Sequence, residues 1–218
     1  LEVVISPGGT NLYAVARGSH SVIYFDRNII TGVLSNKRIL TDAVNTKYAA
    51  GIKISPDGRH VYVVSRSSDS IVYWTRNDET GELTNQINFI DHINLKGAND
   101  LDISPNGQNV YVVSTFSHSL VYWVRDITTG ALTHQVNILD STNLHTARGL
   151  TVSPDGKQVF ATGYGSSTLV YWDRNLQTGH LSKQTVITDS TNLKSPTDVK
   201  MSPDGTTIYV SARRSNSV

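Results

Sequence analysis

Apolar and polar positions follow one pattern that returns along the chain at a fixed interval. The phrase SPDGRHVYVVS begins at Ser55, and close copies begin at Ser6, Ser104, Ser153 and Ser202, each 49 residues after the one before. A fixed period of this length is the sequence signature of a repeat architecture. The chain divides without gaps into four full units, 1–49, 50–98, 99–147 and 148–196, and a partial unit, 197–218.

The second unit shows the elements that every copy predicts. Residues 51–55 alternate as a short strand does, and the SPDG that begins at the end of this strand has the residues of a type I turn. The β-branched run 60–65 predicts a second strand, 70–76 a third and 82–90 a fourth. The third strand is apolar on both faces, so its sheet must be covered on both sides. We expect no helix anywhere.

Four-stranded antiparallel sheets repeated at this period are the blades of a β-propeller. We therefore predict an all-β propeller of four-stranded antiparallel blades with a 49-residue repeat, comprising four full blades and the start of a fifth in a single domain over residues 1–218. The last unit ends where its third strand has just begun. We expect the ring to be completed within a longer chain or, as a homo-oligomer, by another copy of this chain.

Residues that recur in every unit are interpreted as scaffold. Trp74, Trp123 and Trp172 lie in the middle of third strands, where a large aromatic ring is most useful as core. The arginines that end the third strands are expected to clamp adjacent blades, because guanidinium presents a rigid fork of donors. These are Arg27, Arg76, Arg125 and Arg174.

Aspartates that end the fourth strands are expected to brace the loops that follow them. These are Asp42, Asp91, Asp140 and Asp189. If Arg27 pairs with Leu34 across the turn, then Ser19 is expected opposite Asp42, where its hydroxyl could donate to the carboxylate.

Candidate ligand-binding residues come from positions at which the copies differ. The turns between second and third strands lie on the same face of the ring as the loops between units, and the SPDG turns lie on the opposite face. Loops on a rigid scaffold commonly determine ligand specificity. The first strands add charged residues near the central channel, such as Lys53. The candidates are His20, Arg66, Asp69, Asp100, His118, Asp198, Arg213 and Asn216.

Composition and motifs exclude several kinds of function. Lys and Arg total 19 and Asp and Glu total 18, for a net charge of +1. The chain therefore has no strong positive electrostatic potential to attract nucleic acid or an anionic membrane. The chain has no cysteine, which removes disulfides, thiolate metal sites and cysteine nucleophiles. Asp100 and Asp102 share one side of a strand and could hold a hard cation, but no third ligand follows nearby.

No metalloprotease, nucleophile-elbow, P-loop or dinucleotide motif is present. We therefore assign no catalytic residue, no metal ligand and no cofactor, and we lean against an enzyme. The expected partner is a small molecule or glycan, or a protein, with no nucleic acid and no membrane.

The pattern SPDGxxVYV…SxSxxVYWxRxxxTGxL resembles the lactonase-type (YVTN) β-propeller repeat family over essentially the whole chain. The resemblance implies a seven-bladed ring and a kinship with 6-phosphogluconolactonases and with many bacterial propellers of no known activity. No catalytic motif of the lactonases can be matched to positions in this sequence.

Three functions remain open. Near-identical blades with varied polar tips favour a ligand-binding module, of which a lectin-like carbohydrate binder is one form. The family resemblance favours a hydrolase of a sugar lactone. A structural or protein-interaction scaffold is the third. We expect a secreted or periplasmic protein.

Overall fold

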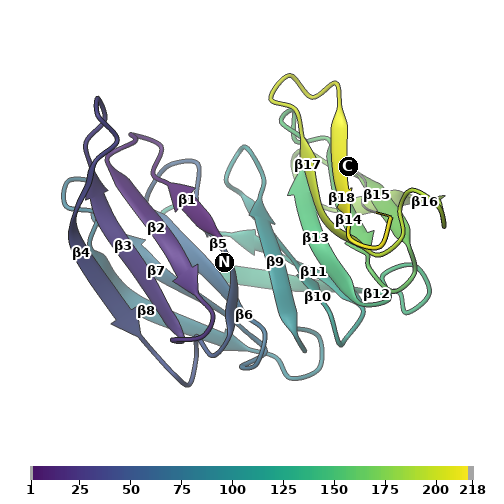
Figure 1. Ribbon diagram of the computed structural model, residues 1–218, viewed down its shortest axis with the longest axis horizontal. Helices are drawn as coiled ribbons and strands as arrows, with labels where there is room; N and C mark the ends of the chain where they lie inside the picture. The colour runs from purple at the N-terminus through teal and green to yellow at the C-terminus, as the bar shows by residue number, and fades with distance from the viewer. Residues whose placement is uncertain (1, 216–218) are drawn as a thin grey trace.

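The computed structural model describes residues 2–215, which form four-stranded antiparallel sheets arranged around an axis (Figure 1). The described residues contain no helix. Each sheet is a blade in which four consecutive strands pair in chain order. The first blade comprises β1 (Val3–Ile5), β2 (Asn11–Ala16), β3 (Ser21–Arg27) and β4 (Leu34–Thr41). The second comprises β5 (Ala49–Ile54), β6 (His60–Ser65), β7 (Ser70–Arg76) and β8 (Leu83–Ile90).

The later blades repeat this arrangement. The third comprises β9 (Ala98–Ile103), β10 (Asn109–Ser114), β11 (Ser119–Arg125) and β12 (Leu132–Leu139). The fourth comprises β13 (Ala147–Val152), β14 (Gln158–Gly163), β15 (Thr168–Arg174) and β16 (Leu181–Thr188). A partial fifth blade pairs β17 (Pro196–Met201) with β18 (Ile208–Ala212). The all-β propeller prediction is confirmed.

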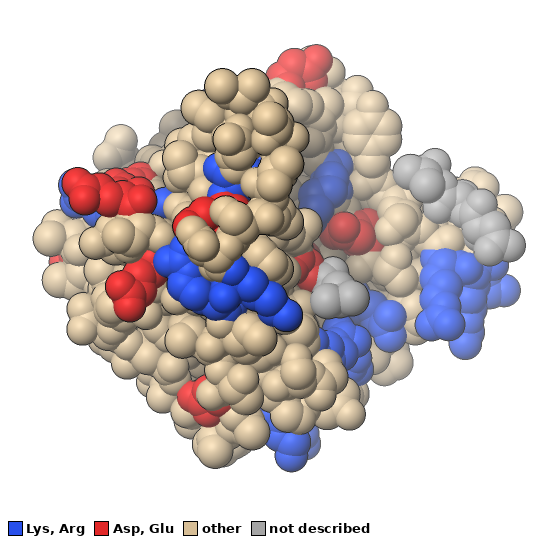
Figure 2. Space-filling view, turned by 60° about the vertical axis from the view of Figure 1, so that its left-hand side comes forward, with Lys and Arg blue, Asp and Glu red and all other residues tan. Residues whose placement is uncertain are grey.

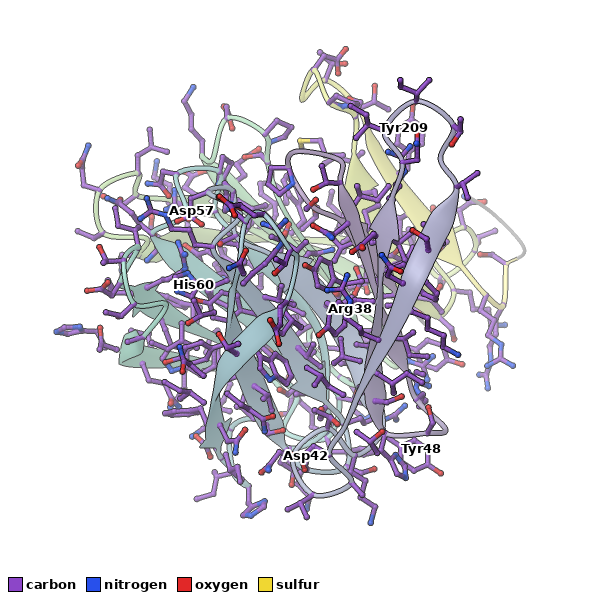
Figure 3. All side chains as sticks on the ribbon, turned by 90° about the vertical axis from the view of Figure 1, so that its left-hand side faces the viewer. Arg38, Asp42, Tyr48, Asp57, His60 and Tyr209 are labelled. Atoms are coloured by element: carbon purple, nitrogen blue, oxygen red, sulfur yellow. The ribbon has the colours of Figure 1, made fainter. Side chains whose placement is uncertain are left out.

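The first strands of successive blades contact one another in chain order and so face the axis of the arc. The SPDG turns lie at one end of the blades and the loops between blades at the other. Figure 3 shows this division, with Asp57 of an SPDG turn toward one end and Asp42 and Tyr48 toward the other.

The register of the third and fourth strands differs from the prediction by one residue. Arg27 does pair with Leu34, but a β-bulge shifts the register between Tyr24 and Asp26, so Ser21 pairs with Thr41. The placement of Ser19 opposite Asp42 was therefore wrong. Asp42 instead accepts hydrogen bonds from the backbone N–H (2.9 Å) and the side-chain amide (2.8 Å) of Asn45, which braces the loop as expected.

The core lies between blades, because each blade is apolar on both faces. Trp74, Trp123 and Trp172 are 2, 0 and 2 % exposed, which confirms that they are core. Trp123 of the third blade belongs to the same apolar cluster as Tyr62 of the second blade. Neighbouring blades therefore supply each other's hydrophobic contacts.

A buried polar clamp joins each of the first three blades to the next at the SPDG end. The Tyr62 hydroxyl donates to the Gly130 carbonyl (2.7 Å) and accepts from Nε of Arg125 (2.9 Å). The same guanidinium donates to the Gly107 carbonyl (2.9 Å) and forms an ion pair with Asp57 (3.1 Å). The clamp recurs one blade earlier with Tyr13 and Arg76, and one blade later with Tyr111 and Arg174. The predicted clamping role is confirmed for Arg76, Arg125 and Arg174, whereas Arg27 bonds to Gly9 of its own blade.

Removing one hydroxyl group from this clamp tests how much the clamp contributes to the free energy of unfolding. We expect Tyr62→Phe to lower the free energy of unfolding by about 1–3 kcal/mol, because it leaves a buried guanidinium N–H and a buried carbonyl without their partner. Denaturant unfolding measures the difference. Tyr209→Phe is the matched control: it lies at the same repeat position but is 53 % exposed, and should change stability little. Equal effects of the two substitutions would contradict the clamp.

Candidate functional site

A cavity of about 560 Å³ opens at the loop end of the central channel. Its wall is built mainly by the first strands of the blades, because those strands line the axis. Most of its lining is polar or charged, and includes Glu2, Lys53, Asn99, Asp100, Arg148, Asp198 and Lys200. Two of the predicted ligand-binding residues, Asp100 and Asp198, therefore lie in one cavity.

The channel carboxylates bond to the backbone of the next blade. An oxygen of Asp100 accepts from the backbone N–H of Leu150 (2.9 Å), and one of Asp102 accepts from that of Val152 (2.8 Å). Glu2 makes the equivalent bond to the N–H of Ile52 (2.8 Å). The first strand of a blade is a sheet edge, so outward N–H groups need partners from outside the sheet. These acids meet that need.

Burial and crowding shift the protonation of the channel acids. Burial raises the pKa of Asp100 well above its usual range, and the nearby charge of Glu2 adds to the rise. Burial likewise raises the pKa of Asp102. Lys53 opposes both shifts, and its ammonium group lies 2.7 Å from a carboxylate oxygen of Glu2. Burial acts to lower the pKa of Lys53, but the acids around it outweigh burial and raise that pKa. The channel thus holds a proton-binding carboxyl group beside a fixed cation.

Arginines gather beside this carboxyl group without acidic partners. Arg17 and Arg148 line the cavity, and the Nε atom of each is buried with no hydrogen-bond partner among the described residues. The Arg148 guanidinium stacks 3.8 Å from the centre of the Tyr164 ring. Burial and repulsion from Arg148 and Arg17 lower the pKa of Arg66, whose guanidinium lies over Phe116. Figure 2 shows how basic and acidic groups gather in clusters on one face of the molecule.

The arginine cluster has the properties of an anion-binding site. Arg213 belongs to the same cluster. Burial is the main cause that lowers the pKa of Arg148, and the positive charge of Arg213 lowers that pKa further. Among residues 2–215, no carboxylate forms an ion pair with Arg17, Arg66, Arg148 or Arg213. Guanidinium groups held together without counter-charges favour a carboxylate, a phosphate or a developing oxyanion.

Three other predicted residues lie apart from the cavity and brace loops. His20, Asp69 and His118 occupy one column of the repeat. Each accepts a hydrogen bond from the backbone N–H that precedes the next blade's first strand, at distances of 3.1, 2.8 and 3.0 Å. Their side chains do not line the channel cavity. Asn216 lies outside the described residues. Ligand binding by His20, Asp69 and His118 stays a prediction.

Sequence reasoning missed Arg148. This residue stands at the second position of the fourth blade's first strand, where the other units carry Leu1, Ala50, Asn99 and Thr197. The signal was an isolated basic residue in a column of otherwise uncharged side chains, next to Gly149.

No helix long and apolar enough to cross a bilayer occurs among residues 2–215. Within the same residues, no three His, Cys, Asp or Glu side chains are placed to hold a metal ion.

The Lys53 cation should make stability depend on pH. We expect Lys53→Met to lower the free energy of unfolding by about 1–3 kcal/mol at pH 8, because ionised Glu2, Asp100 and Asp102 then lose their shared partner. The penalty should be smaller at pH 5. The unfolded-state carboxyl pKa values are the same in both proteins, so they cancel from the comparison. The penalty therefore sets in as the pH rises past the raised folded-state pKa of the channel acids and grows until their still higher pKa in the variant is passed.

Denaturant unfolding at the two pH values measures this effect. Lys157→Met removes an exposed partner of Asp155 and serves as the control, with little change expected at either pH. A Lys53→Met penalty that is larger at pH 5 than at pH 8 would contradict the assignment.

Known structures share this architecture. The periplasmic gluconolactonase of Pseudomonas aeruginosa superposes with a TM-score of 0.81 at 16% identity, covering 98% of this chain and 63% of that one. A candidate 6-phosphogluconolactonase of Bacteroides fragilis gives 0.78 at 17% identity, covering 97% and 63%. A protein of Lactobacillus plantarum gives 0.81 at 19% identity, covering 96% and 63%. This chain therefore spans less than two thirds of the length of each, and at these identities the likeness establishes the fold.

A comparison with curated proteins found no match. The family described as "Lactonase, 7-bladed beta-propeller" matches residues 38–144 and 97–186, which together cover more than half of the chain. The repeat pattern, the four-stranded blades and this match agree. The chain belongs to the lactonase family of seven-bladed β-propellers.

Proposed function

We propose that this chain forms the greater part of a lactonase-type propeller that binds a sugar lactone at the loop end of its central channel and hydrolyses it. The observation that carries the proposal is the meeting of unpaired arginines with a buried carboxyl group of raised pKa in one cavity. Family membership adds support. The finding that relatives in fold are named gluconolactonases agrees with it.

The residues suggest a division of labour in the reaction. Donors on Arg17 and Arg148 would polarise the lactone carbonyl and stabilise the oxyanion that develops on it. A carboxylate of raised pKa is a stronger base than an ordinary one, so Asp100 is the group to take a proton from the attacking water. The water oxygen bonds to the carbonyl carbon, and the ring C–O bond breaks. The departing ring oxygen then takes the proton from Asp100, which leaves an open-chain hydroxy acid.

Asp100 can serve chemistry and structure together. One of its oxygens accepts from Leu101 N–H and the other from Leu150 N–H. Each carboxylate oxygen has two lone-pair sites, so a water molecule can still bond to either. The two backbone bonds hold the carboxylate in one orientation, which favours proton transfer in a fixed geometry.

A pH-stat assay with glucono-δ-lactone and 6-phosphogluconolactone tests the proposal against the spontaneous rate. We expect Asp100→Asn to lower kcat by about 10²–10⁴, the range for loss of a general base. Arg148→Gln should lower kcat/KM by about 10²–10³, the range for loss of one oxyanion donor. Arg59→Gln, an exposed substitution in an SPDG turn at the far end, is the matched control and should leave both constants unchanged.

The outcomes separate the proposal from a binding-only propeller. Saturable lactone binding with no turnover above the spontaneous rate would contradict hydrolysis and favour a lectin-like or other ligand-binding module. Turnover that survives Asp100→Asn unchanged would remove Asp100 from the mechanism. Equal losses in Arg148→Gln and Arg59→Gln would show that the arginine cluster has no special part.

A further inference from the structure

A second cavity, of about 500 Å³, lies between the third and fourth blades, away from the channel. Strands β11 and β12 form one wall, and the turn between β15 and β16 forms the other. Three apolar side chains in it are partly exposed: Val124, Ile127 and Val136 are 39, 49 and 39 % exposed. His134 and His180 stand beside them. The cavity thus combines an apolar floor with imidazole edges.

The corresponding place between the first and second blades shows what kind of group fits there. Two repeats earlier, Arg38 stands at the position of Val136 and Asp26 at that of Val124. The Arg38 guanidinium stacks over the Tyr24 ring, 4.9 Å from its centre, and forms an ion pair with Asp26. It also donates to the Thr80 carbonyl of the next blade (2.9 Å). The guanidinium therefore lies over the tyrosine and reaches the next blade's turn, where it forms part of the wall of the corresponding cavity of about 590 Å³ (Arg38 is labelled in Figure 3).

Between the third and fourth blades this planar group is not supplied by the chain. Val136 has no planar group and is too short to span the cavity, while Tyr122 keeps the place of Tyr24. The Tyr122 hydroxyl lies 3.2 Å from Nδ1 of His180, so that ring is held at the cavity edge. No hydrogen bond within residues 2–215 uses the Nε2 atom of His134 or His180. Both atoms are available to a ligand.

The charges around the cavity restrict its ligand. The position of Asp26 is taken by Val124, and no Asp or Glu lines the cavity, so a bound cation would have no counter-charge. The nearest full charge is Arg125, whose side chain is fully buried and paired with Asp57. Imidazole edges donate to an acid and gain a positive charge when protonated. The volume lies within the range of small-molecule sites.

We propose that the cavity between the third and fourth blades is a second binding site, for a planar aromatic carboxylic acid. The ring takes the place that Arg38 occupies between the first two blades, against Val124, Val136 and Tyr122. The carboxylate lies toward His134 and His180. This site is independent of lactone chemistry in the channel.

The proposal is tested by measuring the binding of 2-naphthoate with calorimetry and with the NMR chemical-shift changes of the histidine rings. The double substitution Val124→Asp and Val136→Arg copies the Asp26–Arg38 pair of the first junction and replaces the apolar floor with charge. We expect it to weaken 2-naphthoate binding at least tenfold. Thr75→Asp with Ile87→Arg makes the same change between the second and third blades, where it should leave binding unchanged.

A second variant covers the case in which the double substitution impairs folding. His134→Asn removes the imidazole from an exposed position and keeps the positive-φ backbone, since Asn36 and Asn85 stand at the same place in the repeat. It should weaken 2-naphthoate binding at least threefold. The proposal is overturned if 2-naphthoate shows no saturable binding, or if neither altered cavity weakens it. It is also overturned if glucono-δ-lactone displaces the probe, which would place the probe in the channel. Binding of methyl glycosides in preference to 2-naphthoate would overturn the aromatic assignment.

Discussion

The stacking of blades depends on the clamp between a tyrosine hydroxyl, an arginine and a turn carbonyl. Hydrophobic contact between two β-sheets is not directional, so it does not by itself fix how one blade sits on the next. The clamp does, because Arg125 donates in fixed directions to its own blade's Gly107 and to Tyr62 of the blade before. Arg27, which has no earlier blade beside it in the described chain, bonds only to Gly9 of its own blade. The same side chain therefore acts as a clamp only where a neighbour is present.

The clamps fix the blades at the SPDG end, so the residues at the loop end of the channel can differ from blade to blade. The first strands approach closely there: a Cβ atom added to Gly149 would lie 2.6 Å from the Cα atom of Asp198. An acid in one blade is thus accommodated by glycine in the blade before it. Glu2, Gly51, Asp100, Gly149 and Asp198 alternate in this way around the channel. The acids bond to edge amides, and this structural need places carboxyl groups where a ligand of the channel would meet them.

The repeat made most of the fold predictable, and the limits of that prediction have physical causes. Turn residues and β-branched runs act locally, so strands, turns and the burial of Trp123 followed from the pattern. The bulge in the fourth strand did not, because the residue with positive φ there is Asn36 in one blade and His134 in another. A bulge is set by backbone geometry that several side chains tolerate. Arg148 was missed because its role depends on which blades meet across the channel.

Variation between repeats has two meanings in this protein, and hydrogen-bond satisfaction separates them. His20 and Asp69 differ in chemistry, yet each accepts from a loop N–H at the same place, so the column requires only an acceptor. Arg148 breaks the repeat, whereas Arg17 shares its column with Arg66 and Arg213. The buried Nε donors of Arg17 and Arg148 have no partner in the described chain. A buried donor without an acceptor is destabilising unless something else supplies one. The anion binding proposed for the channel would supply the missing acceptor, whereas the packing of the blades supplies none within the described chain.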